Sequence, residues 1–432
     1  MKKINWKNAK KIIPGGNSFF SKRAELYLSG LWPSYFTKSK GCNVYDIKNK
    51  KYIDMIMGIG TNILGYSNNK INKKIKNIID KGIMSTLNAP EEYLLAEKML
   101  KINKWADQVK FARGGGEANA IAIRIARAYS KKDNVAFCGY HGWHDWYLSA
   151  NLNNKNNLNK HLLKGIKISG VPNNLKNTAF PFEYNKIEQL ENIINKKRIA
   201  AVKMEVVRNL QPKHNFLNKV QKLCKKKKIV LIFDECTSGF RESFGGLHLK
   251  YKVYPDICIL GKALGNGFPI TTILGKRSIM ENAQTSFISS TFWTEKAGYV
   301  AGLKTLEIME NIKSWKIITN QGKKIKKMLG KIAKHNNIKI NISGLDACPS
   351  YTINSKKWQE YKTLITQELL KERVLGANTT YTSICHNDHV IRNYENKLNK
   401  IFNLIKKIES SGESVKKYLE GPTSHSGFKR LN

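Results

Sequence analysis

The sequence lacks a long apolar run. No segment approaches the roughly 18 consecutive apolar residues that a membrane-spanning helix needs, and Trp6 leads directly into a lysine-rich stretch rather than an apolar segment of secretory length. We therefore expect a protein with no membrane partner that works in the cytoplasm. With 41% hydrophobic residues over 432 positions, the chain can still fill the cores of two or three domains.

Cysteine pairs are missing as well. The seven cysteines are odd in number, lie far apart and form no C-x-x-C pair, so we expect reduced thiols rather than a disulfide framework. A zinc site is disfavoured because His141 and His144 have only Asp145 near them at ligand spacing. The sequence therefore predicts no metal.

Acidic residues are scarce: 32 Asp and Glu stand against 75 Lys and Arg, a formal net charge of +43. Such a charge is typical of a basic nucleic-acid-binding protein, which we keep as an alternative of another class. A recognition surface needs clustered cations, however, and these lysines are scattered among Asn and Ile along the whole chain. The composition alone therefore argues against nucleic acid as the partner.

The common nucleotide motifs are absent too, since neither G-x-x-x-x-G-K-[ST] nor G-x-G-x-x-G occurs at a strand end. Instead, five short apolar segments each run into a glycine turn or a polar residue. Such segments, separated by helical stretches, indicate a largely parallel sheet whose strand ends share one cleft. The segments are 109–112 before Gly114-Gly115-Gly116, 135–138 before Gly139-Tyr140-His141, 200–204 before Glu205, 229–233 before Asp234, and 257–260 before Gly261-Lys262.

The strand ends carry four chemical features. The glycine turn before the helical stretch 118–129 offers backbone N–H groups to a phosphate, although glycines also close ordinary tight turns. Asp234 follows the most apolar strand, where a carboxylate needs a partner, if only a structural ion pair. Lys262 lies between glycines in a tight loop, and Tyr140 with His141 adds an aromatic plane. Phosphate cup, carboxylate, lysine and aromatic plane together fit pyridoxal 5′-phosphate (PLP) best.

These residues also resemble a known family, the class III (fold type I) PLP-dependent aminotransferases, and within it the glutamate-1-semialdehyde 2,1-aminomutase group. The resemblance runs from about residue 10 to about residue 405. Its most specific part is D-E-x-x-x-G-F-R from Asp234 to Arg241, followed by G-K-x-x-G-x-G-x-P from Gly261 to Pro269.

The resemblance implies a role for each matching position. Lys262 matches the lysine that binds the cofactor covalently and moves the substrate proton, Asp234 the partner of the ring nitrogen, and Tyr140 the residue stacked on the ring. The remaining cofactor-binding positions are His141 next to Tyr140, Cys236 on the opposite ring face, Gly115 and Gly116 in the phosphate loop, Glu205 and Asn209 near the ring hydroxyl, and Thr291, which reaches the phosphate from the neighbouring subunit.

The resemblance also implies the architecture. It predicts the α/β fold of PLP-dependent transferases of fold type I, with a large cofactor domain containing a mostly parallel sheet and a small α+β domain. The expected boundaries are 1–70 for the N-terminal part of the small domain, 71–314 for the large domain and 315–432 for the C-terminal part. A threonine shared between subunits implies a homodimer with two shared active sites.

The departures from the family pattern concern the substrate. The aminomutases have Ser-Gly-Thr where this chain has Gly114-Gly115-Gly116, and they have an arginine that clamps the substrate carboxylate where this chain has Lys22 and Arg23 in a displaced register. We therefore predict an aminotransferase that moves an amino group between an amino donor and a small aldehyde or ketone acceptor. Glutamate-1-semialdehyde 2,1-aminomutase, which transfers the group within one molecule, is the alternative.

Overall fold

The computed structural model describes residues 4–428, which fold into two compact units. The central unit comprises Asn69–Lys316, and the terminal unit combines the chain up to Asn68 with the chain from Ile317 onward. The names large and small domain, and the boundaries at 70 and 314, stay predictions. In the described part of the chain, no helix is both long and apolar enough to cross a membrane.

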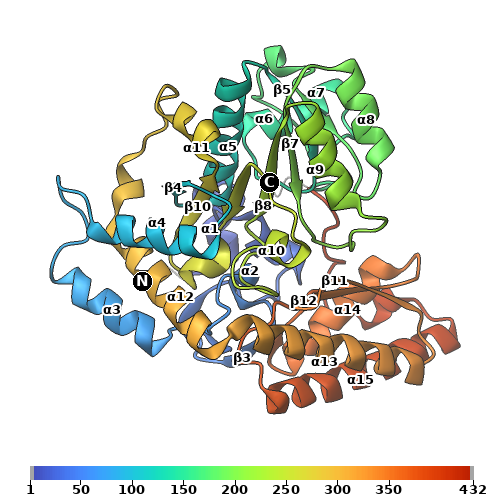
Figure 1. The fold of residues 1–432 in the computed structure, drawn as a ribbon. Helices are drawn as coiled ribbons and strands as arrows, with labels where there is room; N and C mark the ends of the chain where they lie inside the picture. The colour runs from blue at the N-terminus through green and yellow to red at the C-terminus, as the bar shows by residue number, and fades with distance from the viewer. Residues whose placement is uncertain (1–3, 429–432) are drawn as a thin grey trace. The chain divides into compact units, whose positions relative to one another are not determined.

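A seven-stranded sheet of order β4-β10-β9-β8-β7-β5-β6 forms the middle of the central unit (Figure 1). Neighbouring strands are parallel except β10, which is antiparallel to both β4 and β9, so the prediction of a mostly parallel sheet is confirmed. The strands are β4 (Gln108–Ala112), β5 (Asn134–Cys138), β6 (Ala179–Pro181), β7 (Ile199–Glu205), β8 (Val230–Glu235), β9 (Ile257–Leu260) and β10 (Thr271–Gly275).

The reversed strand β10 follows from the length of its connection. Only residues 261–270 separate β9 from β10, and they contain one short 3-10 helix, Lys262–Gly265. A parallel return needs a crossover of a dozen or more residues, so the chain turns back instead. The turn places Lys262 at the end of β9, at the edge of the sheet where β7 and β8 also end.

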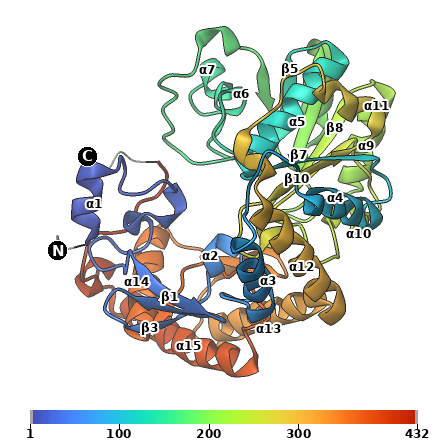
Figure 2. The same ribbon diagram turned by 90° about the vertical axis from the view of Figure 1, so that its left-hand side faces the viewer.

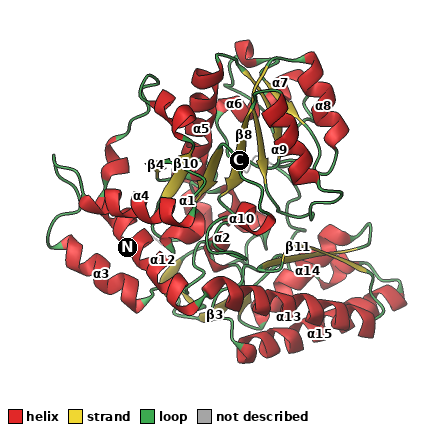
Figure 3. Ribbon diagram, viewed as in Figure 1, coloured by secondary structure: helices red, strands yellow, loops and turns green. Residues whose placement is uncertain are grey.

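Helices cover both faces of this sheet (Figures 1 and 3). Helices α5 and α11 lie on one face, where apolar side chains of α5 pack on Phe137, Ile232 and Ile259, while α8 and α9 lie on the other. The helices of the unit are α3 (Asn69–Ile79), α4 (Pro90–Ile102), α5 (Gly115–Ser130), α6 (Asp145–Leu148), α7 (Ala150–Asn153), α8 (Ile187–Lys196), α9 (Phe216–Lys226), α10 (Leu247–Tyr251), α11 (Arg277–Met280) and α12 (Lys296–Ile312).

The terminal unit is built from segments at both ends of the chain (Figure 2). Its four-stranded sheet pairs β13 (Val374–Leu375) in parallel with β3 (Lys51–Asp54), beyond which lie β2 (Asn43–Asp46) and β1 (Phe36–Lys40). Apolar faces of three long helices share one core with this sheet. The other elements are α1 (Trp6–Ile12), α2 (Met57–Gly60), most of α13 (Ser314–His335), β11 (Ile340–Leu345), β12 (Cys348–Ile353), α14 (Trp358–Lys371) and α15 (Asp388–Ser411).

Candidate active site

Lys262 is held at the end of β9 in an unusual backbone conformation. Its φ angle is 42°, in the left-handed region that a residue with a side chain rarely adopts. Its half-buried amine donates a hydrogen bond of 2.8 Å to Thr237 Oγ1. Burial, and next the positive charge of Arg208, lower the pKa of Lys262. The strained backbone and the lowered pKa are both typical of a reactive lysine.

Asp234 lies at the end of the neighbouring strand β8 and is 5% exposed. Its Oδ2 is 2.9 Å from His141 Nδ1, and its Oδ1 accepts a hydrogen bond of 3.1 Å from the backbone N–H of Cys236. Burial by itself raises the pKa of the carboxyl, but the hydrogen bond from His141 and the charge of Lys203 outweigh it, so the pKa of Asp234 is lowered. The group is thus a buried carboxylate, and each oxygen can still accept one more hydrogen bond.

The next residue, Glu235, points to the other face of the sheet because successive strand residues alternate. It is fully buried and accepts hydrogen bonds from the Ser238 hydroxyl, the N–H groups of Leu247 and His248, and the His248 ring at 2.6 Å. The other ring nitrogen of His248 accepts a hydrogen bond from Trp105. This closed network explains the second acidic residue of the D-E pair as a structural group.

The glycine turn leads into α5. The Glu117 side chain accepts hydrogen bonds from the N–H groups of Arg113 and Gly114, which leaves the first-turn N–H groups of Gly115 and Gly116 directed outward from the helix end. A Cβ atom at Gly115 would lie 3.1 Å from Cys236 Sγ, and one at Gly116 would lie 3.3 Å from the His144 ring. The turn is therefore packed so closely that it presents backbone rather than side chains.

Tyr140 and Glu205 are joined at the ends of β5 and β7. The Tyr140 N–H donates a hydrogen bond of 3.0 Å to Glu205 Oε2, and the same oxygen lies 3.4 Å from Arg208 Nη1. The Arg208 guanidinium also lies over the Tyr140 ring, 5.4 Å from its centroid. Sequence reasoning missed Arg208 and the hydroxyl of Thr237. Both are close in sequence to predicted residues, but only the fold shows that their side chains approach Tyr140 and Lys262.

Two predicted residues lie apart from this cluster. Asn209 is exposed, and within residues 4–428 no hydrogen bond joins its side chain to Glu205 or Lys262. Thr291 is also exposed, on a 3-10 helix (Thr291–Thr294) that Arg113 fixes through hydrogen bonds to the carbonyls of Phe292 and Trp293. The roles predicted for Asn209 and Thr291 stay predictions.

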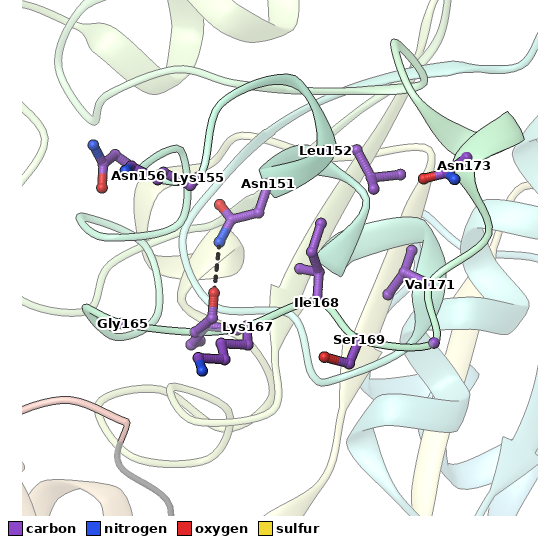
Figure 4. Close-up of a pocket in the computed structure, with 12 residues that line it drawn as sticks. Asn151, Leu152, Lys155, Asn156, Gly165, Lys167, Ile168, Ser169, Val171 and Asn173 are labelled. Atoms are coloured by element: carbon purple, nitrogen blue, oxygen red, sulfur yellow. Dashed lines mark hydrogen bonds between the residues drawn. The ribbon is translucent and has the colours of Figure 1, made fainter.

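The stretch from 147 to 181 contains α7, a 3-10 helix (Asn173–Leu175) and strand β6. Its residues line a cavity of about 750 Å³ that is open to solvent (Figure 4). Two of the lining residues are joined by a hydrogen bond of 3.4 Å, which Asn151 Nδ2 donates to the carbonyl of Ile166. None of the predicted site residues lines this cavity. It is therefore distinct from the cluster around Lys262.

Comparison with known proteins decides the family. The pattern of the family described as Aminotransferase class-III matches residues 30–386. The chain belongs to this family. It is 30% identical over 394 residues to 3-aminobutyryl-CoA aminotransferase of Cloacimonas acidaminovorans (strain Evry), covering 88% of this chain and 91% of that protein. It is likewise 30% identical over 417 residues to glutamate-1-semialdehyde 2,1-aminomutase of Saccharolobus islandicus (strain L.S.2.15 / Lassen #1), covering 92% and 96%.

Solved structures agree on the fold of this class-III aminotransferase family member. The PLP internal aldimine form of the FumI protein from Sphingopyxis sp. MTA144 superimposes with a TM-score of 0.84 at 20% identity, covering 94% of this chain and 96% of that one. A transaminase with PLP bound gives 0.83 at 21% identity, covering 93% and 97%. These structures confirm the prediction of fold type I, and together with the family match they confirm the predictions of an enzyme that is a transaminase or a related aminomutase and of PLP as its cofactor.

The residues of the cluster fit PLP. The buried Asp234 carboxylate keeps an unused acceptor position on each oxygen, and a buried carboxylate with spare capacity suits a cationic ring nitrogen. The backbone donors of Gly115 and Gly116 suit a phosphate. Lys262 stands within the same set of strand ends, with a lowered pKa. The ring nitrogen, the phosphate and the aldehyde of PLP therefore each have a chemically matching group in the central unit.

Proposed function

We propose that the protein is an aminotransferase that moves an amino group between a small amino donor and a separate aldehyde or ketone acceptor. The observation that carries this proposal is the Lys262 amine, held 2.8 Å from Thr237 Oγ1 beside the buried pair of Asp234 and His141. An amine and an ionised carboxylate at adjacent strand ends are the two groups that amino transfer on PLP needs.

The bound cofactor supplies a pyridine ring that takes up the electrons released when a proton leaves the substrate's α-carbon. Lys262 Nζ would take that proton and return it, which its lowered pKa favours because more of the amine is neutral. The Asp234 carboxylate, oriented by His141, would hold a proton on the ring nitrogen. Tyr140 and Cys236 would lie against the two faces of the ring, and Gly115 and Gly116 would bind the phosphate.

Substrate recognition would rest on Arg208, which lies beside Tyr140 and lowers the pKa of Lys262. Its side chain is 43% exposed, so the planar guanidinium is accessible to an acidic group of the substrate. In the terminal unit, by contrast, the Arg23 guanidinium packs against Gly15 and lies over the rings of Phe20 and Phe428. These contacts support a carboxylate or phosphate bound by Arg208 rather than by the family's N-terminal clamp.

The second candidate is glutamate-1-semialdehyde 2,1-aminomutase, because several relatives with about 30% identity carry that name. The decisive test supplies glutamate 1-semialdehyde without any amino donor and follows 5-aminolevulinate. We expect negligible product, and we expect turnover only when an amino donor and a keto or aldehyde acceptor are both present. Efficient isomerisation without a donor, lost in Arg23→Ala, would establish the aminomutase with a displaced clamp.

The role of Lys262 has a direct test. Lys262→Ala should still bind PLP but should not be trapped covalently by borohydride, and its turnover should fall about 10⁴-fold because the proton carrier is gone. Lys276→Ala, which removes an exposed lysine paired with Asp256, is the matched control and should behave as wild type. Covalent trapping retained in Lys262→Ala would remove that lysine from the proposed role.

We also propose a homodimer with shared active sites in the cytoplasm. Phe287 and Phe292, which are 91% and 69% exposed, flank Thr291 on a segment that Arg113 anchors beside the glycine turn. Exposed apolar side chains next to a site are typical of a subunit interface. All seven cysteines are free thiols in the structure, which supports a reducing compartment. Sedimentation of Phe292→Asp should show a monomer with weakened PLP binding; an intact dimer would contradict this interface.

A further inference from the structure

Lys203 is a cation in the core of the central unit that none of the roles above uses. It lies in the middle of β7, where all seven residues are buried, and it is 0% exposed. In the described chain its Nζ atom has no hydrogen-bond partner. An unpaired buried ammonium group is costly, so its presence calls for a physical explanation.

The sheet register places Lys203 beneath Asp234. Lys203 is aligned with Ile232 on β8, and Glu205 is aligned with Asp234. Because side chains alternate along each strand, Lys203, Ile232 and Asp234 share one face, with Lys203 diagonal to the carboxylate. A four-carbon side chain is long enough to bring its ammonium group toward Asp234 from the side opposite the strand ends.

Among the ionisable groups around the ammonium group of Lys203, Asp234 acts on it most strongly. The groups that act on Lys203 are, in decreasing order, Asp234, Cys236, Cys258 and Glu205, and both cysteines are thiols whose pKa burial raises. Burial lowers the pKa of Lys203 to about 8, and the negative charge of Asp234 opposes that change. An apolar residue of similar volume would fill the same space among Phe137, Ile232 and the side chains of α5 without this cost.

We propose that Lys203 is a positioning residue that acts through Asp234 and limits how strongly the carboxylate holds the proton of the cofactor's ring nitrogen. This inference rests on the proposed role of Asp234. A neighbouring cation stabilises the carboxylate and makes it a weaker base, and it also repels a protonated ring nitrogen. Both effects act in the same direction, so the ring releases its proton at a lower pH than it would beside Asp234 and His141 alone.

The test uses the holoenzyme loaded with PLP labelled with ¹⁵N in the ring, whose nitrogen chemical shift reports protonation directly. We expect the ring nitrogen to titrate about one pH unit higher in Lys203→Met than in wild type, because the repelling charge is gone. Lys203→Gln, which also removes the charge but stays polar, should show the same increase. Lys203→Arg, which keeps the charge, should titrate as wild type.

Ile232→Met is the matched control, since it changes packing at the aligned position without changing charge. Equal shifts in Ile232→Met and Lys203→Met, or no shift in either charge-removing variant, would overturn the proposal. Asp234→Asn distinguishes a failure of the role of Asp234 from a failure of the role of Lys203. If Asp234→Asn titrates as wild type, the role of Asp234 itself fails; if it shifts while the Lys203 variants do not, only the role of Lys203 fails.

Discussion

Two carboxylates that follow one another on β8 have opposite surroundings. Glu235 is enclosed by four hydrogen-bond donors, and its histidine partner is itself paired with Trp105. Asp234, on the other face, has two donors, spare acceptor positions and a nearby lysine whose amine has no hydrogen-bond partner in residues 4–428. The acceptor positions of Glu235 are filled by donors of the protein itself, whereas Asp234 keeps positions that only a further donor can fill. A saturated buried network stabilises the fold, and an unsaturated one is available for chemistry.

Asp234→Asn removes the carboxylate that has spare acceptor positions and should have the largest effect. A neutral amide cannot hold the ring nitrogen in its cationic form, so proton transfer from the substrate should slow by about 10² or more while the protein stays folded. Stopped-flow absorbance of the half-reaction measures the rate. Wild-type turnover in this variant would show that the carboxylate is structural, like its neighbour.

Glu235→Gln breaks the closed side. Its amide replaces one acceptor by a donor that faces the N–H group of either Leu247 or His248, so the free energy of unfolding should fall by about 3 kcal/mol. Turnover per folded molecule should stay near wild type. Urea unfolding combined with titration of active sites separates the two quantities; a large loss of turnover at full folding would place Glu235 in the chemistry.

A pH series sharpens the comparison further. The pKa of Lys203 is about 8 in the folded chain and ordinarily 10.5. Between pH 8 and pH 10.5 the unfolded chain therefore keeps a proton on Lys203 that the folded chain has released. Stability therefore rises with pH in this window and is lost as pH falls through 8. Relative to Lys203→Met, wild type should gain up to about 3 kcal/mol of unfolding free energy between pH 8 and 10.5. A constant difference across that range would mean that Lys203 titrates normally.

The smallest expected effect concerns the phosphate turn. Gly114 has an extended backbone (φ −117°, ψ 150°), and a Cβ atom there would meet only Glu117 Oε2 at 3.7 Å. Gly114→Ser would restore a hydroxyl that the resembling aminomutases have. PLP should bind more tightly by about 1 kcal/mol, roughly fivefold in Kd, as measured by fluorescence titration of the apoenzyme. Weaker binding would show that the turn already has its full set of donors.

The sequence predicted best those site residues whose position follows from the direction of the strands alone. Apolar strands ending at Asp234 and before Lys262 predicted a mostly parallel sheet with chemical groups at one edge, because carboxyl ends of parallel strands meet there. The sequence could not predict features that depend on strand register or on the length of a short connection. Lys203 was one lysine among many until its alignment with Ile232 placed it beneath a carboxylate, and strand β10 reverses because ten residues cannot form a crossover.

The contact between the glycine turn and the following loop limits the order in which this site can change. Gly142 has a φ angle of 97°, and a Cβ atom there would lie 3.0 Å from the Gly116 Cα, while a Cβ at Gly116 would meet His144. A threonine at 116, which the resembling aminomutases have, would therefore require the His144 ring to shift by a few tenths of an ångström. A smaller residue at 144 would remove that requirement. Positions 116, 142 and 144 thus form an epistatic set, in which the benefit of one replacement depends on another already made.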